Sequence, residues 1–227
     1  MTVEQKTKIQ ACIEREYRFY NEVVPYIDLV EVYFGAIKDG MLNDIRKFMG
    51  HIASAATADG DEPEVRLENL NDAHRHMRRI LLNCYKLMCI HQQDYIKEFK
   101  RKFRFFNTND VDDGNFDVKL NNMLLKAERL FKEAKGADNT GKNDKKLFKY
   151  SLESELSEEE SIVAGLDEVY EKYCIAYNAF CDAVNYINAH YEGVIRVAKK
   201  HILGTIVSFS GWALGIILSI VLFLAEK

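Results

Sequence analysis

The chain has 227 residues, of which 48% are hydrophobic and 29% are charged, and its formal net charge is −4. This length is enough for one domain with its own core, and the slightly acidic balance argues against a general nucleic-acid binder. The 5 cysteines show no paired spacing, so we expect them to be reduced, small core residues rather than a disulfide framework.

Apolar residues at spacings of three and four run along most of the chain, whereas alternating β-branched runs are missing. This pattern predicts an all-α fold, an elongated antiparallel bundle of about four helices followed by a C-terminal transmembrane helix. The helices are expected over residues 5–52, 63–107, 115–135 and 157–200, with a flexible loop at 136–145. Residues 1–200 are expected to form one cytosolic bundle.

The fourth expected helix has the most regular apolar pattern. Ser157 and Glu160 have the spacing of a capping box at its start. Its alternation of three and four predicts either a coiled-coil seam or the core stripe of a bundle. We call this set the heptad seam, and it consists of Val163, Leu166, Tyr170, Tyr173, Tyr177, Phe180, Val184, Ile187, Tyr191, Val194 and Ala198.

The C-terminal stretch from Ile202 to Ala225 contains no charged residue. A helix of about 24 residues is about 36 Å long, enough for one tilted crossing of a hydrocarbon core of about 30 Å. The sequence therefore predicts a single-pass protein whose partner is the lipid bilayer. Cations precede this stretch at positions 196, 199 and 200, and the positive-inside rule then keeps the bulk of the chain in the cytoplasm.

Small residues recur within this stretch, and Gly211 and Gly215 form a GxxxG motif. Such a stripe lets two membrane helices approach closely, which predicts a homo-oligomer, with an inert anchor as the alternative. Trp212 lies near the middle of the stretch, where it could pack on a partner helix or line a pore. The expected contact set is Gly204, Ser208, Gly211, Trp212, Gly215 and Ser219.

Two local groups of cations have alternative interpretations. The segment KEFKRKFRFF, with Lys97, Lys100, Arg101, Lys102 and Arg104, could bind phosphates of lipid or RNA. Alternatively, its phenylalanines face a core and its cations are solvated near a helix end. The group of basic residues at positions 74–79 is expected to be a solvated face.

A metal site is not expected, because Cys84, Cys89 and His91 do not follow a zinc-ligand spacing. No other cofactor is expected either. The chain also lacks the Walker loop, HExxH and Gly-x-Ser-x-Gly patterns, so it is not predicted to be an enzyme.

Two segments match the pattern Arg-x4-His, Arg46 to His51 and Arg196 to His201. Together with the helical segment 69–87, they give the chain a resemblance to the HEPN superfamily of all-helical domains. Many members of that superfamily are RNases of prokaryotic defence and toxin systems, and some are membrane-associated. The residue after the arginine is usually small and polar there, but Lys47 or Val197 here, so the resemblance implies the fold rather than catalysis.

These patterns predict a tail-anchored protein that homo-oligomerises through its membrane helix and the adjoining heptad helix. Its expected role is a membrane-perturbing or pore-forming effector or accessory of a defence or toxin system. The alternative is a non-catalytic tether or scaffold for a cytosolic protein partner. A SNARE-like protein has the same order of elements, but the heptad seam lacks the central Gln or Arg that a SNARE requires.

Overall fold

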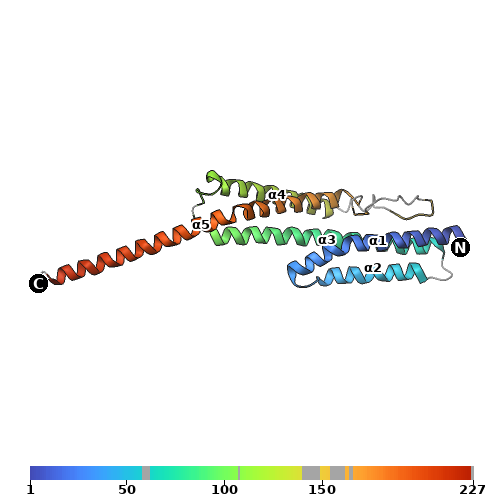
Figure 1. Ribbon diagram of the computed structural model, residues 1–227. Coiled ribbons are helices and arrows are strands. Elements are labelled where there is room, and N and C mark those ends of the chain that lie inside the picture. Colours follow the sequence, from blue (N-terminus) through green and yellow to red (C-terminus); the bar gives the residue numbers. More distant parts are fainter. Residues whose placement is uncertain (58–61, 107, 140–148, 154–161, 164–165, 226–227) are drawn as a thin grey trace. The chain divides into compact units, whose positions relative to one another are not determined.

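The computed structural model describes residues 1–57, 62–106, 108–139, 149–153, 162–163 and 166–225, without the side chains of 213 and 217–225. Within these ranges the chain is helical and has no strand, so the all-α prediction is confirmed. The helices are α1 (Val3–Phe34), α2 (Asp39–Thr57), α3 (Pro63–Phe103), α4 (Phe116–Asn139) and α5 (Glu168–Ala225), with a 3₁₀ turn at Asp112–Gly114 (Figure 1).

The single helix expected over residues 5–52 is wrong, because α1 and α2 are separate helices that form a hairpin (Figure 1). Pro25 lies inside α1, and the chain turns at Gly35 instead. Gly35 has a φ of 72°, and its N–H donates to the Glu31 carbonyl at 2.7 Å. This left-handed C-cap requires a residue without a Cβ, and it ends α1.

The other boundaries differ less from the predicted ones. Pro63 opens α3 as expected of a proline in the first helical turn. The third expected helix extends to Asn139, so residues 136–139 are helical and not part of the expected loop, whereas 140–145 lie outside the described residues. Residue 107, the expected end of α3, also lies outside them.

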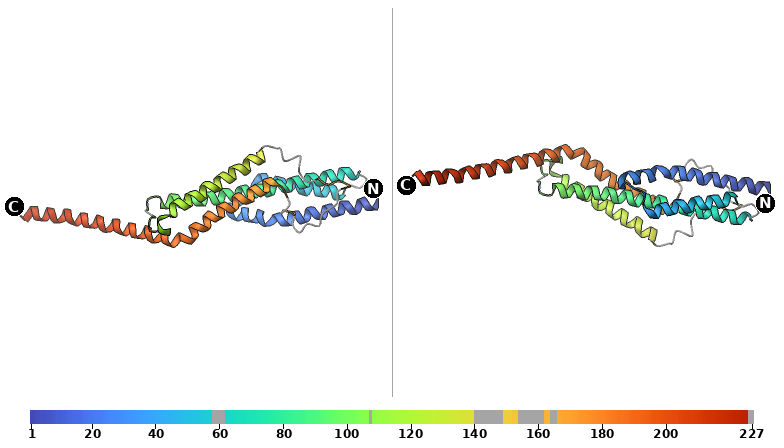
Figure 2. Two further views of the ribbon diagram at one scale, coloured as in Figure 1. Left: turned by 90° about the horizontal axis from the view of Figure 1, so that it is seen from above. Right: turned by 90° about the horizontal axis from the view of Figure 1, so that it is seen from below.

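The start of α5 was also mispredicted. Ser157 and Glu160 lie outside the described residues, and α5 begins at Glu168. Its N-cap is Asp167, whose carboxylate accepts the N–H groups of Val169 at 2.8 Å and Tyr170 at 3.0 Å. From there α5 continues without interruption to Ala225, so the heptad region and the apolar tail belong to one helix (Figure 2).

The chain divides into two compact units. Unit 1 comprises Met1–Gln92 and Lys126–Phe180, and unit 2 comprises Gln93–Leu125 and Cys181–Lys227. The core of unit 1 lies between α1, α2 and the first part of α3, where Phe19, Phe48 and Met77 have no exposed surface. Burial of such side chains stabilises a helical unit by roughly 2 kcal/mol each.

Unit 2 is built from the last part of α3, the first part of α4 and the corresponding part of α5. Phe99 and Phe103 of α3 pack on Tyr191 of α5, with ring centroids 6.4 and 6.3 Å apart. Phe116 at the start of α4 stacks on Tyr186 of α5 at 5.4 Å. These aromatic contacts hold three helices together near the point where the apolar tail begins.

Candidate functional site at the start of the apolar tail

The part of α5 that follows His201 is exposed along its described surface. Every described side chain from 201 to 216 is exposed, and Phe209 and Trp212 are 68% and 64% exposed. A helix that is apolar on all sides normally lies in a protein core or in lipid. In this chain no protein core covers the described apolar side chains of the tail.

A search of the residues that the structure describes finds no helix long and apolar enough to cross a membrane.

The small residues of the tail lie along the exposed helix. A Cβ added at Gly204, Gly211 or Gly215 would meet no atom within 4 Å. Trp212 contacts Phe209, with ring centroids 5.9 Å apart. The side chain of Ser219 lies outside the described ones. The three glycine positions of the expected oligomer contact are therefore open, and a side chain added there would meet no other described atom at its Cβ.

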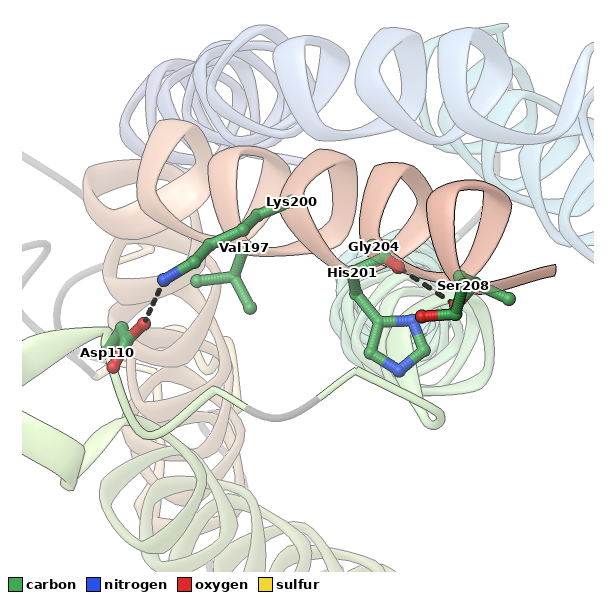
Figure 3. A pocket seen from close by; sticks show the side chains of 7 residues that line it. Asp110, Val197, Lys200, His201, Gly204 and Ser208 are labelled. Carbon is green, nitrogen blue, oxygen red and sulfur yellow. Dashed lines mark hydrogen bonds and ion pairs between the residues drawn. The ribbon is translucent and has the colours of Figure 1, made fainter. Parts of the chain in front are cut away.

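A hollow of about 550 Å³ lies in unit 2 where the tail begins (Figure 3). At one end of the hollow, Nζ of Lys200 lies 3.7 Å from Oδ2 of Asp110 (Figure 3). His201 projects toward the other end of the hollow, near Ser208 (Figure 3). The full lining is Asp110, Val197, Lys200, His201, Gly204, Thr205 and Ser208.

The hollow combines hydroxyl, imidazole and ammonium groups with the first apolar turns of the tail. The Thr205 hydroxyl donates to the His201 carbonyl at 2.9 Å, as threonine does when its side chain satisfies its own helix. Donors of this kind suit an anionic headgroup at a bilayer surface.

The basic segment at the end of α3 combines features of both interpretations. Phe99 and Phe103 are buried, as expected of a helix that faces a core, and Phe105 is 73% exposed. Arg101 binds Glu98 at 2.7 Å, and Lys100 donates to Asn121 at 2.6 Å. Lys102 lies over the Phe103 ring at 5.4 Å. The cations of this segment are thus on the surface of unit 2, above a buried aromatic row.

The heptad seam is covered within the chain. None of its described members is exposed, and Tyr173, Phe180 and Ile187 have no exposed surface at all. Val163 and Leu166 precede α5 instead of lying in it. Of the two interpretations left open by the sequence, the core stripe of a bundle matches this burial. A coiled coil between copies would need the same residues to leave that core.

The two Arg-x4-His matches do not form compact sites. Residues five apart on a helix point about 140° away from each other, which separates Arg46 from His51 and Arg196 from His201. His51 instead lies 3.1 Å from the Asn69 amide oxygen and stacks on His76. His201 contacts Phe106 edge-on, with centroids 5.6 Å apart.

The basic group at positions 74–79 is not the solvated face that the sequence predicts. Arg75 and Arg79 are exposed, whereas His74 is buried and Arg78 lies with its Nε 2.5 Å from the Asp167 carboxylate. Nδ1 of His76 lies 2.9 Å from the Asp44 carboxylate. Helical spacing alone did not reveal these partners, because the acids come from distant helices.

A buried polar cluster in unit 1 was also missed from the sequence. Glu16 has no exposed surface, and its Oε1 accepts from Nδ1 of His74 at 2.8 Å and from the Tyr150 hydroxyl at 2.6 Å. The side-chain amide of Asn71 binds the Tyr150 backbone twice: its Oδ1 accepts from the Tyr150 N–H at 2.7 Å, and its Nδ2 donates to the Tyr150 carbonyl at 3.3 Å. Burial, and then the charge of Glu16, raise the pKa of Tyr150, so its hydroxyl stays a donor.

Cys84, Cys89 and His91, from which the sequence predicts no metal site, have separate surroundings in the fold. Cys84 and Cys89 are buried in the core, and His91 stacks on Tyr33 with centroids 3.9 Å apart. Within the described part of the chain, no group of three or more His, Cys, Asp or Glu residues could hold a metal ion.

Comparisons with protein-family models, with curated proteins and with solved structures give no match to this chain.

Proposed function

We propose that this chain is a single-pass membrane protein anchored by residues 202–225, with its helical units on the cytoplasmic side. The observation that carries the proposal is the charge-free stretch that follows Lys200, whose described side chains are all exposed. Leaving this much apolar surface in water is unfavourable, at about 25 cal/mol per Å². Lipid is the environment that covers such a helix on every side.

Cations before the tail support this orientation. Arg196, Lys199 and Lys200 precede the apolar stretch. Arg196 and Lys199 are exposed on α5, where they can contact the headgroups of the cytoplasmic leaflet.

We further propose that copies associate through the small-residue stripe of the tail and that the assembled tails perturb or permeabilise the bilayer. Gly204, Gly211 and Gly215 support close contact between helices, because nothing in the described chain occupies their open side. The heptad seam does not take part in this proposal, since its residues already form the core of one chain. The resemblance to membrane-associated HEPN-like proteins suggests a defence or toxin setting.

A second candidate is a non-catalytic tether that holds a cytosolic partner at the membrane. The burial of the heptad seam favours it, because the bundle completes its core without a second copy. In this case the tail anchors the chain and forms no pore.

The deciding experiment measures the mass of full-length protein extracted in detergent and ion leakage from vesicles that contain it. We expect a defined oligomer that leaks, and we expect Gly211→Leu with Gly215→Leu to give monomers and sealed vesicles. Ile206→Leu with Ile217→Leu is the matched control, because positions 206 and 217 lie on the opposite side of the helix from the stripe.

Three other results would change the proposal. A monomer that leaves vesicles sealed would support the tether. If the oligomer persists after the glycine substitutions, the contact between copies lies at residues other than the stripe. Release of the wild-type chain from membranes by alkaline carbonate, without detergent, would refute the anchor itself.

A further inference from the structure

We propose that unit 2 carries a second membrane contact: the exposed cations at the end of α3 and on α5, with Phe105, form a docking surface for anionic lipid headgroups. We call it the basic collar, and it consists of Lys100, Lys102, Arg104 and Phe105 beside α5, with Arg196 and Lys199 on the sides of α5 that face away from Phe106. The inference rests on the proposed anchor. It adds a preference for anionic lipid and a contact between the folded part of unit 2 and the bilayer surface.

The geometry brings two distant segments to the start of the tail. Phe106 comes three residues after Phe103, where α3 ends, and its N–H donates to the Phe103 carbonyl at 3.0 Å. The Phe106 ring lies against His201, the residue before the apolar stretch. Phe103 packs on Tyr191, about three turns earlier on α5. Residues 100–105 therefore lie beside the last polar turns of α5, all within unit 2.

Most carboxylates near the collar are engaged by other groups, and the exposed Glu192, one turn before Arg196 on α5, is outnumbered by the collar cations. Glu98 is paired with Arg101, and Asp112 with Lys119 at 2.7 Å. Asp110 lies near Lys200, and Asp117 accepts a hydrogen bond from the Thr108 hydroxyl. Asp113, in the 3₁₀ turn, is the remaining acid of this loop.

The collar cations have no such partners. Among the described residues, Lys102, Arg104, Arg196 and Lys199 have no carboxylate within 4.0 Å. A lysine or arginine near an anionic leaflet strengthens binding about fivefold, which corresponds to about 1 kcal/mol.

Phe105 gives the collar an apolar contact. It is 73% exposed, while its neighbours in the aromatic row are turned into unit 2. The Arg104 guanidinium lies over its ring, 4.2 Å from the centroid. An aromatic side chain flanked by cations is the arrangement that inserts at a headgroup boundary while the charges remain with the phosphates.

These observations favour lipid over RNA as the phosphate source. In an anchored chain the bilayer surface begins where the tail begins, and the collar lies beside that point through the Phe106 and His201 contact. Binding single-stranded RNA by stacking uses a series of exposed aromatic rings. Here Phe99 and Phe103 are buried and the half-buried Phe106 lies against His201, so Phe105 is the one exposed ring of the segment.

The test uses full-length protein in vesicles. Tryptophan fluorescence is the readout, because the chain contains a single tryptophan, Trp212. In a Trp212→Phe background, Phe105→Trp places the fluorophore in the collar. We expect lipids with a quencher near the headgroup to quench it strongly in vesicles with about 30% phosphatidylserine and at least threefold less in phosphatidylcholine. Adding Lys100→Gln, Lys102→Gln and Arg104→Gln should remove the difference.

The matched control replaces three exposed cations of unit 1, Arg18, Lys47 and Lys126, by glutamine and should retain the difference. The unsubstituted chain reports on the anchor separately, because quenchers deep in the acyl chains should reach Trp212. If Trp212 is quenched but the collar tryptophan is not, the collar is refuted and the anchor stands. If Trp212 is not quenched, the proposed function fails.

Two further outcomes would also overturn the collar. Equal quenching in both vesicle types would show that the cations do not select anionic lipid. Protection of the collar tryptophan by a short single-stranded RNA, lost in the triple variant and unaffected by phosphatidylserine, would assign the cations to RNA.

Discussion

Asp167 has two roles, since it caps α5 and binds Arg78 of α3. Asp167→Ala removes both interactions and should lower the free energy of unfolding by about 1–2 kcal/mol. Asp167→Asn keeps an oxygen for the Val169 and Tyr170 amides and should cost less than the alanine variant. Urea unfolding of the three proteins in detergent measures the difference. Equal losses in the two variants would mean that the cap contributes nothing.

The same residue makes a prediction about pH. Burial on its own raises the pKa of Asp167, but Arg78 and the amides of Tyr170 and Val169 outweigh it, so the pKa lies below its ordinary value of 3.8. A lowered carboxyl pKa stabilises the fold above the unfolded value, and this contribution is lost as pH falls through the folded value. The stability difference between wild type and Asp167→Asn should therefore be constant near pH 7 and shrink below about pH 4. A difference that grows on acidification would contradict the assignment.

The buried Glu16 depends on two side-chain donors, the His74 imidazole and the Tyr150 hydroxyl. Tyr150→Phe removes one donor and leaves a buried carboxylate with less compensation, which should cost about 1–3 kcal/mol. Tyr17→Phe is the control, because Tyr17 is largely exposed, and it should change stability by less than about 0.5 kcal/mol. Thermal or urea unfolding checks both, and equal stability of Tyr150→Phe and wild type would show that Glu16 does not need this donor.

At the scale of elements, the turn between α1 and α2 depends on the left-handed conformation of Gly35. Gly35→Ala should destabilise the protein by about 1 kcal/mol, because a Cβ is unfavourable at φ 72°. Gly50→Ala offers the opposite case, since Gly50 lies inside α2 with open space around its Cβ position. This variant should gain about 0.5–1 kcal/mol. Urea unfolding of both variants tests the pair, and a neutral Gly35→Ala would argue against the cap.

The elements also explain where sequence reasoning succeeded and where it failed. Apolar spacing predicted helices throughout and the start of α3 at Pro63. It missed the turn at Gly35, because apolar residues keep their spacing of three and four on both sides of it. It placed the start of α5 at Ser157, because a capping box is a local signal, whereas Asp167 is held by Arg78 from a distant helix.

The candidate site could be predicted only in part for a related reason. The apolar tail and the cations of KEFKRKFRFF are visible in composition. Their neighbourhood is not, because the contact of Phe106 with His201 joins residues far apart in the sequence. The pairing of Glu16 with His74 is likewise a product of helix packing, which one-dimensional periodicity does not encode.

At the scale of the whole molecule, the chain has 5 cysteines, and the described structure joins none of them in a disulfide. Burial raises the pKa of the Cys12 thiol to about 11 and that of Cys84 to about 12, so little thiolate forms near neutral pH. The helices of both units are thus held by packing, caps and ion pairs. The apolar tail is the part whose described side chains are all exposed.

The unbroken course of α5 gives the molecule a fixed torsional register. From Cys181 onward, the α5 residues that fill the core of unit 2 and the residues of the tail belong to one continuous helix. Neighbouring residues in it are rotated by about 100° about the helix axis. An axial twist applied to the folded part would therefore turn the small-residue stripe by the same angle, without a hinge to absorb it. In the proposed assembly, the side of the tail that faces another copy is therefore set by the folded part of unit 2.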